Sequence, residues 1–195
     1  YNAGHGLPFD SEGMKERYPG VFFSQFTGAE LVADKWNLSR EDLDKFALES
    51  HQKAAHATES KYFDKEILPV EGKNAEGIND LVMADEGIRF DASLDKLAGL
   101  NPVTEGGVIT AGNASQITDG AAAVVICNDA GLKKIQANPR AEIVSISVVG
   151  DDPVFMLTGP IPASKKALET ANLSIDDMDL YEVNEAFAPV PLAWA

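Results

Sequence analysis

Residues 106–127 read GGVITAGNASQITDGAAAVVIC, and no other segment indicates the fold class as clearly. Residues 111–115 are almost all small, which lets this backbone approach another backbone or a ligand closely. Residues 121–127 form a continuous apolar run, which predicts a strand buried on both faces. Because such strands belong to sheets that helices cover, the segment indicates a layered α/β fold.

The rest of the second half alternates as an α/β fold requires. A helix is expected around Leu132, and the β-branched run over residues 143–149 predicts another strand. Pro162 suits the first turn of a following helix. Residues 179–183 then predict a short strand that ends at Asn184. Strands that alternate with helices predict α/β layers in this half.

The first half is predicted to be mixed and helix-rich. Residues 1–28 are rich in glycine and aromatic residues with weak periodicity, which indicates loop with short elements. Thr27 with Glu30 forms a capping-box pattern that opens a short helix. Ser39 with Asp42 opens a longer helix over residues 39–60, with small and apolar residues inside and the charges facing out. A short extended piece over residues 67–70 and a short helix at residues 93–100 follow.

The composition excludes several classes of function. The 195 residues hold 16 Lys and Arg against 31 Asp and Glu, a formal charge of −15, which is too acidic for a nucleic-acid binder. No apolar run approaches the roughly 20 residues that a membrane-spanning helix needs, so no membrane contact is expected. The apolar fraction of 45% is enough for a sizeable core.

Cysteine and histidine give no sign of a metal site. Cys127 is the only cysteine, which excludes an internal disulfide and suits a reducing, cytoplasmic location. Its place inside an apolar run predicts a core residue whose burial suppresses the reactive thiolate. His51 and His56 are five residues apart on one predicted helix and therefore lie on different faces. His5 is isolated near the start.

Two segments are candidate sites, and each has a plainer interpretation. Residues 111–115 can be a ligand-binding approach or a tight turn that leads into the strand at residue 121. Asn184, directly after a predicted strand, can orient a water or donate to an oxyanion, or it can form an Asx turn or helix N-cap. Pro189 and Pro191 require that any following helix begins later or has a distorted first turn.

Three motifs follow one another along the chain: GNAS at residues 112–115, continuing as TDGAAA at 118–123; TGPIPA at 158–163; and VNEAFA at 183–188. Together they closely resemble the thiolases, the family of acetyl-CoA acetyltransferase and 3-ketoacyl-CoA thiolase. Residues 28–40 resemble the start of the family's loop domain. The resemblance covers nearly the whole chain and is weakest before about residue 22.

This resemblance implies a fold and a division of the chain. Thiolases have two similar α/β halves in a layered αβαβα core, and a helix-rich loop domain inserted into the first half covers coenzyme A. Residues 1–117 then correspond to the loop domain. Residues 118–139 correspond to the end of the N-terminal half, and residues 140–195 to the beginning of the C-terminal half. The expected fold is α/β and incomplete in this chain.

The resemblance also implies roles for individual residues. Asn184 matches the family's catalytic asparagine, which holds a water that helps to bind the thioester oxygen. Ala186 and Phe187 match positions that line the pocket near the acyl group. Ala111 and Ser115 match positions that line the pantetheine channel.

A further match concerns the phosphates of coenzyme A. Arg89 matches a loop-domain arginine near the nucleotide end of the ligand. A chain of charge −15 that binds a phosphate-bearing molecule needs local cations, because its overall field repels such a ligand. Coenzyme A is expected as a co-substrate, and no tightly bound cofactor is expected.

The family's nucleophilic cysteine lies upstream of the loop domain, and a histidine and a second cysteine lie further downstream. Of this set only Asn184 is matched, so the chain alone is predicted to be inactive. Where many biosynthetic thiolases carry His-Met-Gly, this chain has Ser24-Gln25-Phe26. That difference favours a degradative enzyme of lipid metabolism, acting in β-oxidation of a longer or bulkier 3-ketoacyl-CoA.

Other functions fit the same residues. The main alternative is a non-catalytic acyl-CoA-binding relative that keeps the fold without the cysteines. A condensing enzyme of the ketoacyl synthase type would place a histidine where this chain has Asn184. A structural or assembly fragment would bind no ligand at all. The resemblance further implies a homodimer or homotetramer.

Overall fold

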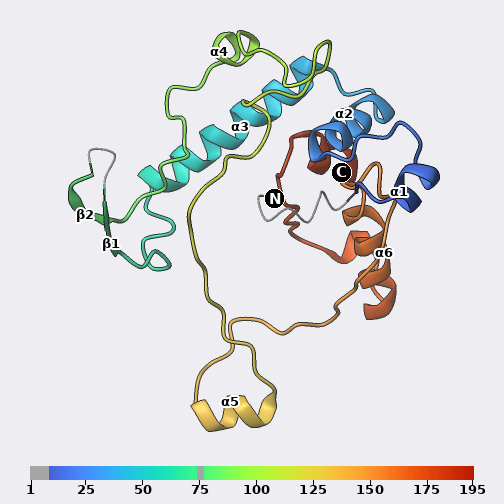
Figure 1. Cartoon of the computed structure of the whole chain (residues 1–195). Helices are drawn as coiled ribbons and strands as arrows, with labels where there is room; N and C mark the ends of the chain where they lie inside the picture. Colours follow the sequence, from blue (N-terminus) through green and yellow to red (C-terminus); the bar gives the residue numbers. More distant parts are fainter. Residues whose placement is uncertain (1–8, 74–76) are drawn as a thin grey trace.

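The structure is a computed structural model that describes residues 9–73 and 77–195, so His5 lies outside the described residues. In these residues the chain forms α-helices, one short 3₁₀ helix and one two-stranded sheet (Figure 1). In chain order they are α1 Glu12–Arg17, α2 Gln25–Lys35, α3 Arg40–Glu59, β1 Val70–Lys73, β2 Asn79–Val82, α4 Leu94–Ala98, α5 Asp129–Ile135, α6 Pro160–Ala171, η1 Ile175–Asp177 and α7 Pro189–Trp194.

The long helix α3 forms as its sequence predicts. Ser39 is its N-cap, and the capping box with Asp42 is complete, since each side chain accepts from the other residue's backbone N–H. Leu43 and Ala47 are buried on its inner face. One expectation is wrong: the charges do not all face out, because the Asp44 carboxylate is buried.

The start of α2 differs from the prediction. Ser24, not Thr27, is the N-cap, and its hydroxyl accepts the Phe26 N–H at 3.2 Å. Glu30 therefore lies within the helix rather than in a capping box. Its carboxylate accepts the backbone N–H groups of Val108 and Ile109 at 2.9–3.1 Å. The tertiary contact replaces the local one because two unpaired backbone donors lie within its reach.

The first half also contains a small hairpin. Strands β1 and β2 are antiparallel, with Val70 opposite Val82 and Lys73 opposite Asn79. The extended piece expected at residues 67–70 is therefore displaced, and the strand begins where that piece ends. Helix α4 is capped by Ser93, as expected.

The core lies where four segments meet. Helices α2 and α3 contribute Ala29, Ala33 and Leu43, and residues 108–114 contribute Ile109. Residues 183–192 complete the core with Phe187, Ala188 and Val190. Fully burying a side chain such as Leu43 or Ile109 stabilises the fold by roughly 1.5–3 kcal/mol. This core therefore joins the 111–115 segment to the 184–187 segment.

The three strands predicted for the second half are not paired. Residues 121–127, 143–149 and 179–183 are extended but lie in no sheet, because β1 and β2 are the only ladder partners among the described residues. Most of their apolar side chains face solvent: Val125 is 85% exposed and Ile146 is 74% exposed, whereas Val183 packs against the core. Figure 1 shows the chain running out to α5 and back.

The prediction that Cys127 is a core residue is wrong for the same reason. The cysteine is exposed at the end of the extended segment that precedes α5. An apolar strand buries its side chains only when sheet and helix layers cover both of its faces. In the described residues no such layers cover residues 121–127.

Both proline-containing helices begin at a proline. Helix α6 starts at Pro160, which places Pro162 in its first turn as expected. Helix α7 starts at Pro189 with Ala188 as N-cap, so both of its prolines lie in the first turn, where a missing N–H costs no helical hydrogen bond. This confirms that the helix begins later, and it excludes Asn184 as its N-cap. In the described part of the chain no helix has the length and apolarity to span a bilayer.

Candidate functional site

The two candidate segments lie side by side. The Ser115 N–H donates to the Ala186 carbonyl at 2.9 Å, and the Ala188 N–H donates to the Asn113 carbonyl at 2.9 Å. An antiparallel bridge pairs Ala114 with Phe187. These backbone contacts align the GNAS motif, residues 112–115, with residues 184–188.

The small-residue segment 111–115 forms a tight turn, and its backbone lies close to the side chains of Leu97 and Leu100. The Asn113 N–H donates to the Thr110 carbonyl at 3.3 Å, and the Gly112 N–H donates to the Thr110 hydroxyl at 3.1 Å. A Cβ atom at Gly112 would lie 2.6 Å from the Leu97 side chain and 2.7 Å from the Leu100 side chain. A larger residue would displace these two leucine side chains, so the turn lies directly against α4 and the residue after its C-cap.

A cavity of about 210 Å³ opens beside these segments. It is smaller than the roughly 300–1,000 Å³ of pockets that enclose a drug-sized ligand, so it suits one narrow part of a larger molecule. Its walls come from α3, the 112–116 turn and the 184–187 segment, through Ala47, Ser50, His51, Gly112, Asn113, Ala114, Ser115, Gln116 and Glu185.

Hydrogen bonds tie α3 to this cavity. The Ser50 hydroxyl donates to Glu185 Oε2 at 2.8 Å. His51 Nδ1 accepts the backbone N–H of Arg89 at 3.2 Å. A neutral imidazole that accepts at Nδ1 carries its proton on Nε2, so His51 presents a donor at that atom.

The structure brings together part of the predicted site. Ser115 lines the cavity, and Ala186 contacts it through the backbone bond described above. Phe187 is only 5% exposed and belongs to the core, where its ring meets the ring of Phe26 edge-to-face at 5.3 Å. Ala111 is exposed in the same turn.

Asn184 and Arg89 do not line the cavity themselves. Asn184 is exposed directly beside Glu185, which does line it. Arg89 is exposed and is connected to the cavity through His51. The Lys96 ammonium, which donates to Asp91, holds the pKa of that carboxyl below its ordinary value, and Arg89 adds a smaller effect of the same sign. Arg89 and Lys96 are therefore two cations that act on the same carboxylate.

Ser50, His51, Gln116 and Glu185 line the cavity without having been predicted to do so. The signal for Ser50 was present, since it lies on the small-residue stripe of α3 that faces inward. The signal for His51 was not, because a lone histidine on a helix carries no pattern. The described residues contain no group of three or more potential metal ligands.

Comparisons with known proteins agree with this arrangement. A family model described as "Thiolase, N-terminal domain" matches residues 11–130, and one described as "Thiolase, C-terminal domain" matches residues 137–195. The chain is 48% identical to the steroid 3-ketoacyl-CoA thiolase FadA6 of Mycobacterium tuberculosis over 185 residues, which cover 95% of this chain and 44% of the relative.

Solved structures show the same fold. The structure of the Bacillus anthracis acetyl-CoA acetyltransferase superposes with a TM-score of 0.84 and 40% identity, over 90% of this chain and 45% of the other. The structure of human mitochondrial 3-ketoacyl-CoA thiolase gives a TM-score of 0.81 and 45% identity, over 86% of this chain and 42% of the other.

The chain spans about half the length of the curated relatives that it matches. Its fold is an incomplete α/β thiolase fold, which explains why extended apolar segments lie unpaired. Two family models cover most of the residues, and a relative 48% identical is matched over 95% of the chain. The chain therefore belongs to the thiolase family.

Proposed function

We propose that the protein containing this chain is a thiolase that transfers an acyl group between a 3-ketoacyl-CoA and coenzyme A. The observation that carries this proposal is the alignment of the GNAS motif with residues 184–188 around one cavity. Small side chains on one segment and an amide on the adjacent segment suit a narrow thioester chain next to a polar group that meets its carbonyl oxygen.

The residues of this chain bind and orient rather than break bonds. Ser115 and Ala111 border the pantetheine arm, Ala186 and Phe187 lie near the acyl group, and Asn184 orients a water toward the thioester oxygen. A cysteine nucleophile forms the acyl intermediate and a base activates the coenzyme A thiol. We assign that role to a residue other than Cys127, because Cys127 directly precedes the N-cap of α5, and α5 lies away from α2 and α3 (Figure 1).

Arg89 contributes a cation for the nucleotide phosphates. It is exposed, and Lys96 lies close enough to the same loop for both to lower the pKa of Asp91. Exposed cations attract a polyanionic ligand that the overall charge of −15 repels. Coenzyme A is thus a co-substrate, and no tightly bound cofactor takes part.

The substrate we propose is a longer or bulkier 3-ketoacyl-CoA, cleaved in the degradative direction. Phe26 stands in the Ser24-Gln25-Phe26 segment that replaces His-Met-Gly, and its ring packs on Phe187. The name of FadA6, a steroid 3-ketoacyl-CoA thiolase, agrees with a bulky substrate for this relative. The same proposal divides the chain after residues 117 and 139. It also includes a homodimer or homotetramer and a cytoplasmic location.

The test compares thiolysis of acetoacetyl-CoA with thiolysis of longer 3-ketoacyl-CoA substrates by the protein at its natural length. We expect a higher kcat/KM for the longer substrates. Asn184→Ala should lower kcat by about 10²–10³, the usual effect of removing one oxyanion donor. Asn138→Ala is the matched control, because Asn138 is exposed in the connection after α5 and should leave the rate unchanged.

Each other outcome has a distinct meaning. Saturable coenzyme A binding without turnover by the natural protein would favour the non-catalytic relative. Absence of binding in isothermal titration would favour a structural fragment. The 195-residue chain alone should show no thiolysis, and a normal rate from it would contradict the assignment of the nucleophile to another segment.

A further inference from the structure

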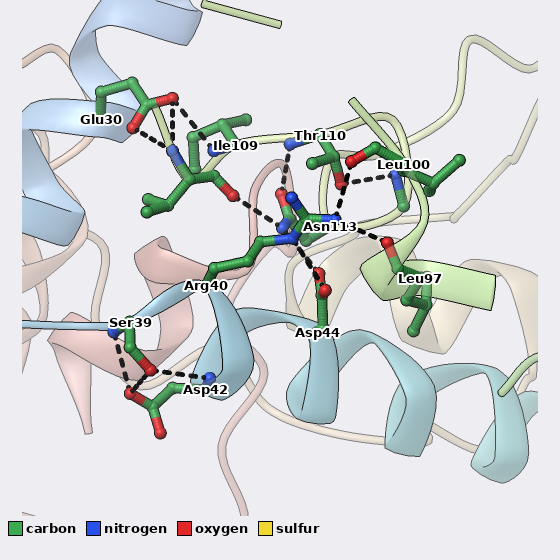
Figure 2. A network of polar contacts seen from close by, with 12 residues as sticks. Glu30, Ser39, Arg40, Asp42, Asp44, Leu97, Leu100, Ile109, Thr110 and Asn113 are labelled. Carbon is green, nitrogen blue, oxygen red and sulfur yellow. Dashed lines mark hydrogen bonds and ion pairs between the residues drawn. The ribbon is translucent and has the colours of Figure 1, made fainter. Parts of the chain in front are cut away.

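A buried ion pair lies next to the cavity and contacts Asn113, which forms part of the cavity wall. Asp44 and Asn113 are each only 3% exposed. Asp44 Oδ2 accepts from Arg40 Nε at 2.7 Å, and Asp44 Oδ1 accepts from Asn113 Nδ2 at 3.0 Å. Since a buried carboxylate is costly unless it is paired and hydrogen-bonded, Asp44 depends on both contacts (Figure 2).

Asn113 is fully engaged inside the protein. Besides donating to Asp44, its Nδ2 donates to the Val108 carbonyl at 3.1 Å, and its Oδ1 accepts the Thr110 N–H at 2.9 Å. Its own carbonyl accepts the Ala188 N–H at 2.9 Å. Asn113 therefore connects α3, the 110–116 turn and the segment before α7, and its side-chain amide has no donor left for a ligand.

Arg40 extends the same network to α4. One guanidinium nitrogen donates to the carbonyls of Leu97 and Leu100, at 2.5 Å and 3.0 Å. These carbonyls lie at the end of α4 and just after it, and the Leu97 carbonyl also accepts the backbone N–H of Leu100 at 3.0 Å. Gly112 packs on the side chains of the same two leucines, so Arg40 fixes the surface on which the turn rests.

We propose that Asp44 and Asn113 are positioning residues for coenzyme A binding. This inference rests on the proposed function. Through Asn113, the carboxylate of Asp44 sets the position of the 110–116 turn, and two residues later Ser115 lines the cavity and donates to Ala186. Neither Asp44 nor the side-chain amide of Asn113 needs to touch the ligand to determine where the wall of the cavity lies.

Asp44→Asn tests the proposal in the protein at its natural length. The amide nitrogen introduced at position 44 is a donor, and it must lie against a second donor, either Arg40 Nε or Asn113 Nδ2. The repulsion between the two donors displaces the turn. We expect the dissociation constant for coenzyme A, measured by isothermal titration, to rise about 10-fold to 100-fold, comparable to the loss of one hydrogen bond to a charged group. Exchange of the Ser115 amide hydrogen should become faster in the same variant.

Val32→Ala is the matched control for loss of stability. Val32 lies on α2, is fully buried, takes no part in the polar network and does not belong to the core cluster that joins the two site segments. The control should melt at a lower temperature but bind coenzyme A with the affinity of the unmodified protein. If Asp44→Asn bound as tightly as the unmodified protein, or if Val32→Ala weakened binding equally, the positioning role would be overturned.

A second variant covers the case in which Asp44→Asn does not fold. In Asp44→Asn/Asn113→Asp the amide at position 44 donates to the carboxylate at position 113, which restores their contact, while the Val108 carbonyl loses the donor that Asn113 Nδ2 supplied. Asn113→Asp alone loses the same donor and also places two carboxylates against each other. The double variant should therefore bind coenzyme A more tightly than Asn113→Asp, and equal or weaker binding would overturn the proposal. If the unmodified protein bound no coenzyme A, the proposed function would fail, while exchange at Ser115 would still show whether Asp44 holds the turn.

Discussion

A close backbone contact between the two halves of the chain depends on a single glycine. A Cβ atom on Gly28 would lie 2.6 Å from the carbonyl oxygen of Phe155, which is backbone and cannot turn away. Helix α2 therefore packs directly against the loop that precedes α6. The absence of one side chain allows this contact between distant parts of the sequence.

Gly28→Ala should destabilise the protein although alanine favours helices. The added methyl group forces α2 and the Phe155 backbone apart, at a cost of about 1–3 kcal/mol for overpacking. Gly13→Ala in α1 is the control: a Cβ atom there has no neighbour within 4 Å, so stability should stay equal or rise by up to about 1 kcal/mol. Urea denaturation of both variants measures the difference, and equal stability of Gly28→Ala would contradict the close contact.

Single residues also show where sequence patterns mislead. Glu30 fits a capping box with Thr27 in sequence, yet it pairs with Val108 and Ile109. Asp44 looks like one more charge on a polar helix, yet it is buried beside Asn113. In both cases the partner lies more than 60 residues away, and a local pattern contains no information about it.

At the level of elements, local chemistry predicts the helices well. Helices α3 and α4 begin after the serines that their capping patterns indicate, and α6 carries proline in its first turn. Capping depends on residues within one turn, so the signal is complete in the sequence. Strands differ, because an extended segment becomes a strand only when another segment pairs with it.

The capping box of α3 should make stability depend on pH. Hydrogen bonds from the Ser39 side chain and backbone hold the pKa of Asp42 below its ordinary value of 3.8. The stabilisation is therefore complete above pH 3.8 and is lost as the pH falls through the lower pKa of the folded state. Asp42→Asn should lower the free energy of unfolding at pH 7. At a pH below the folded-state pKa of Asp42, the variant and the unmodified protein should have the same free energy of unfolding.

The control for this comparison lies at the other end of α3. Glu59→Gln removes a negative charge from the last helical residue, where the helix dipole does not favour it. It should leave stability at pH 7 unchanged or slightly higher. Urea denaturation over a series of pH values checks both variants, and a constant difference between Asp42→Asn and the unmodified protein across that series would exclude the carboxylate as its cause.

At the level of the whole molecule, the layers of the second half are incomplete. Residues 121–127 and 143–149 show apolar side chains to solvent, while Ser145 and Ser147 face α6 and donate to the carbonyls of Ala167 and Ala163. Helices thus lie where the α/β prediction requires them. The sheet that would join them is missing from the described residues.

The isolated 195-residue chain should therefore bind hydrophobic dyes. A variant with Val125, Ile146 and Leu180 all changed to threonine should bind less dye and keep its melting temperature, because these side chains are at least 74% exposed. Changing Thr118 to serine and Glu142 and Glu182 to glutamine is the control, which should leave dye fluorescence unchanged. Equal dye binding by both variants would show that these segments are covered in solution.

The site was predictable only in part, for a related reason. The resemblance to thiolases places Ser115 and Ala186 near one ligand, and the structure joins them by a hydrogen bond. No sequence pattern indicates the contact of Ser50 with Glu185 or of His51 with Arg89. These contacts depend on how α3 is rotated against the other segments, which only the assembled core determines.

The joint between residues 113–115 and 186–188 consists of backbone atoms. The Ser115 N–H donates to the Ala186 carbonyl, and the Ala188 N–H donates to the Asn113 carbonyl. Because neither hydrogen bond involves a side chain, the alignment does not depend on which residues occupy positions 114, 115 and 186. Evolution can therefore vary the polarity and size of the cavity wall while its frame stays constant. A family that handles acyl groups of many shapes could diversify from such a joint by point substitutions alone.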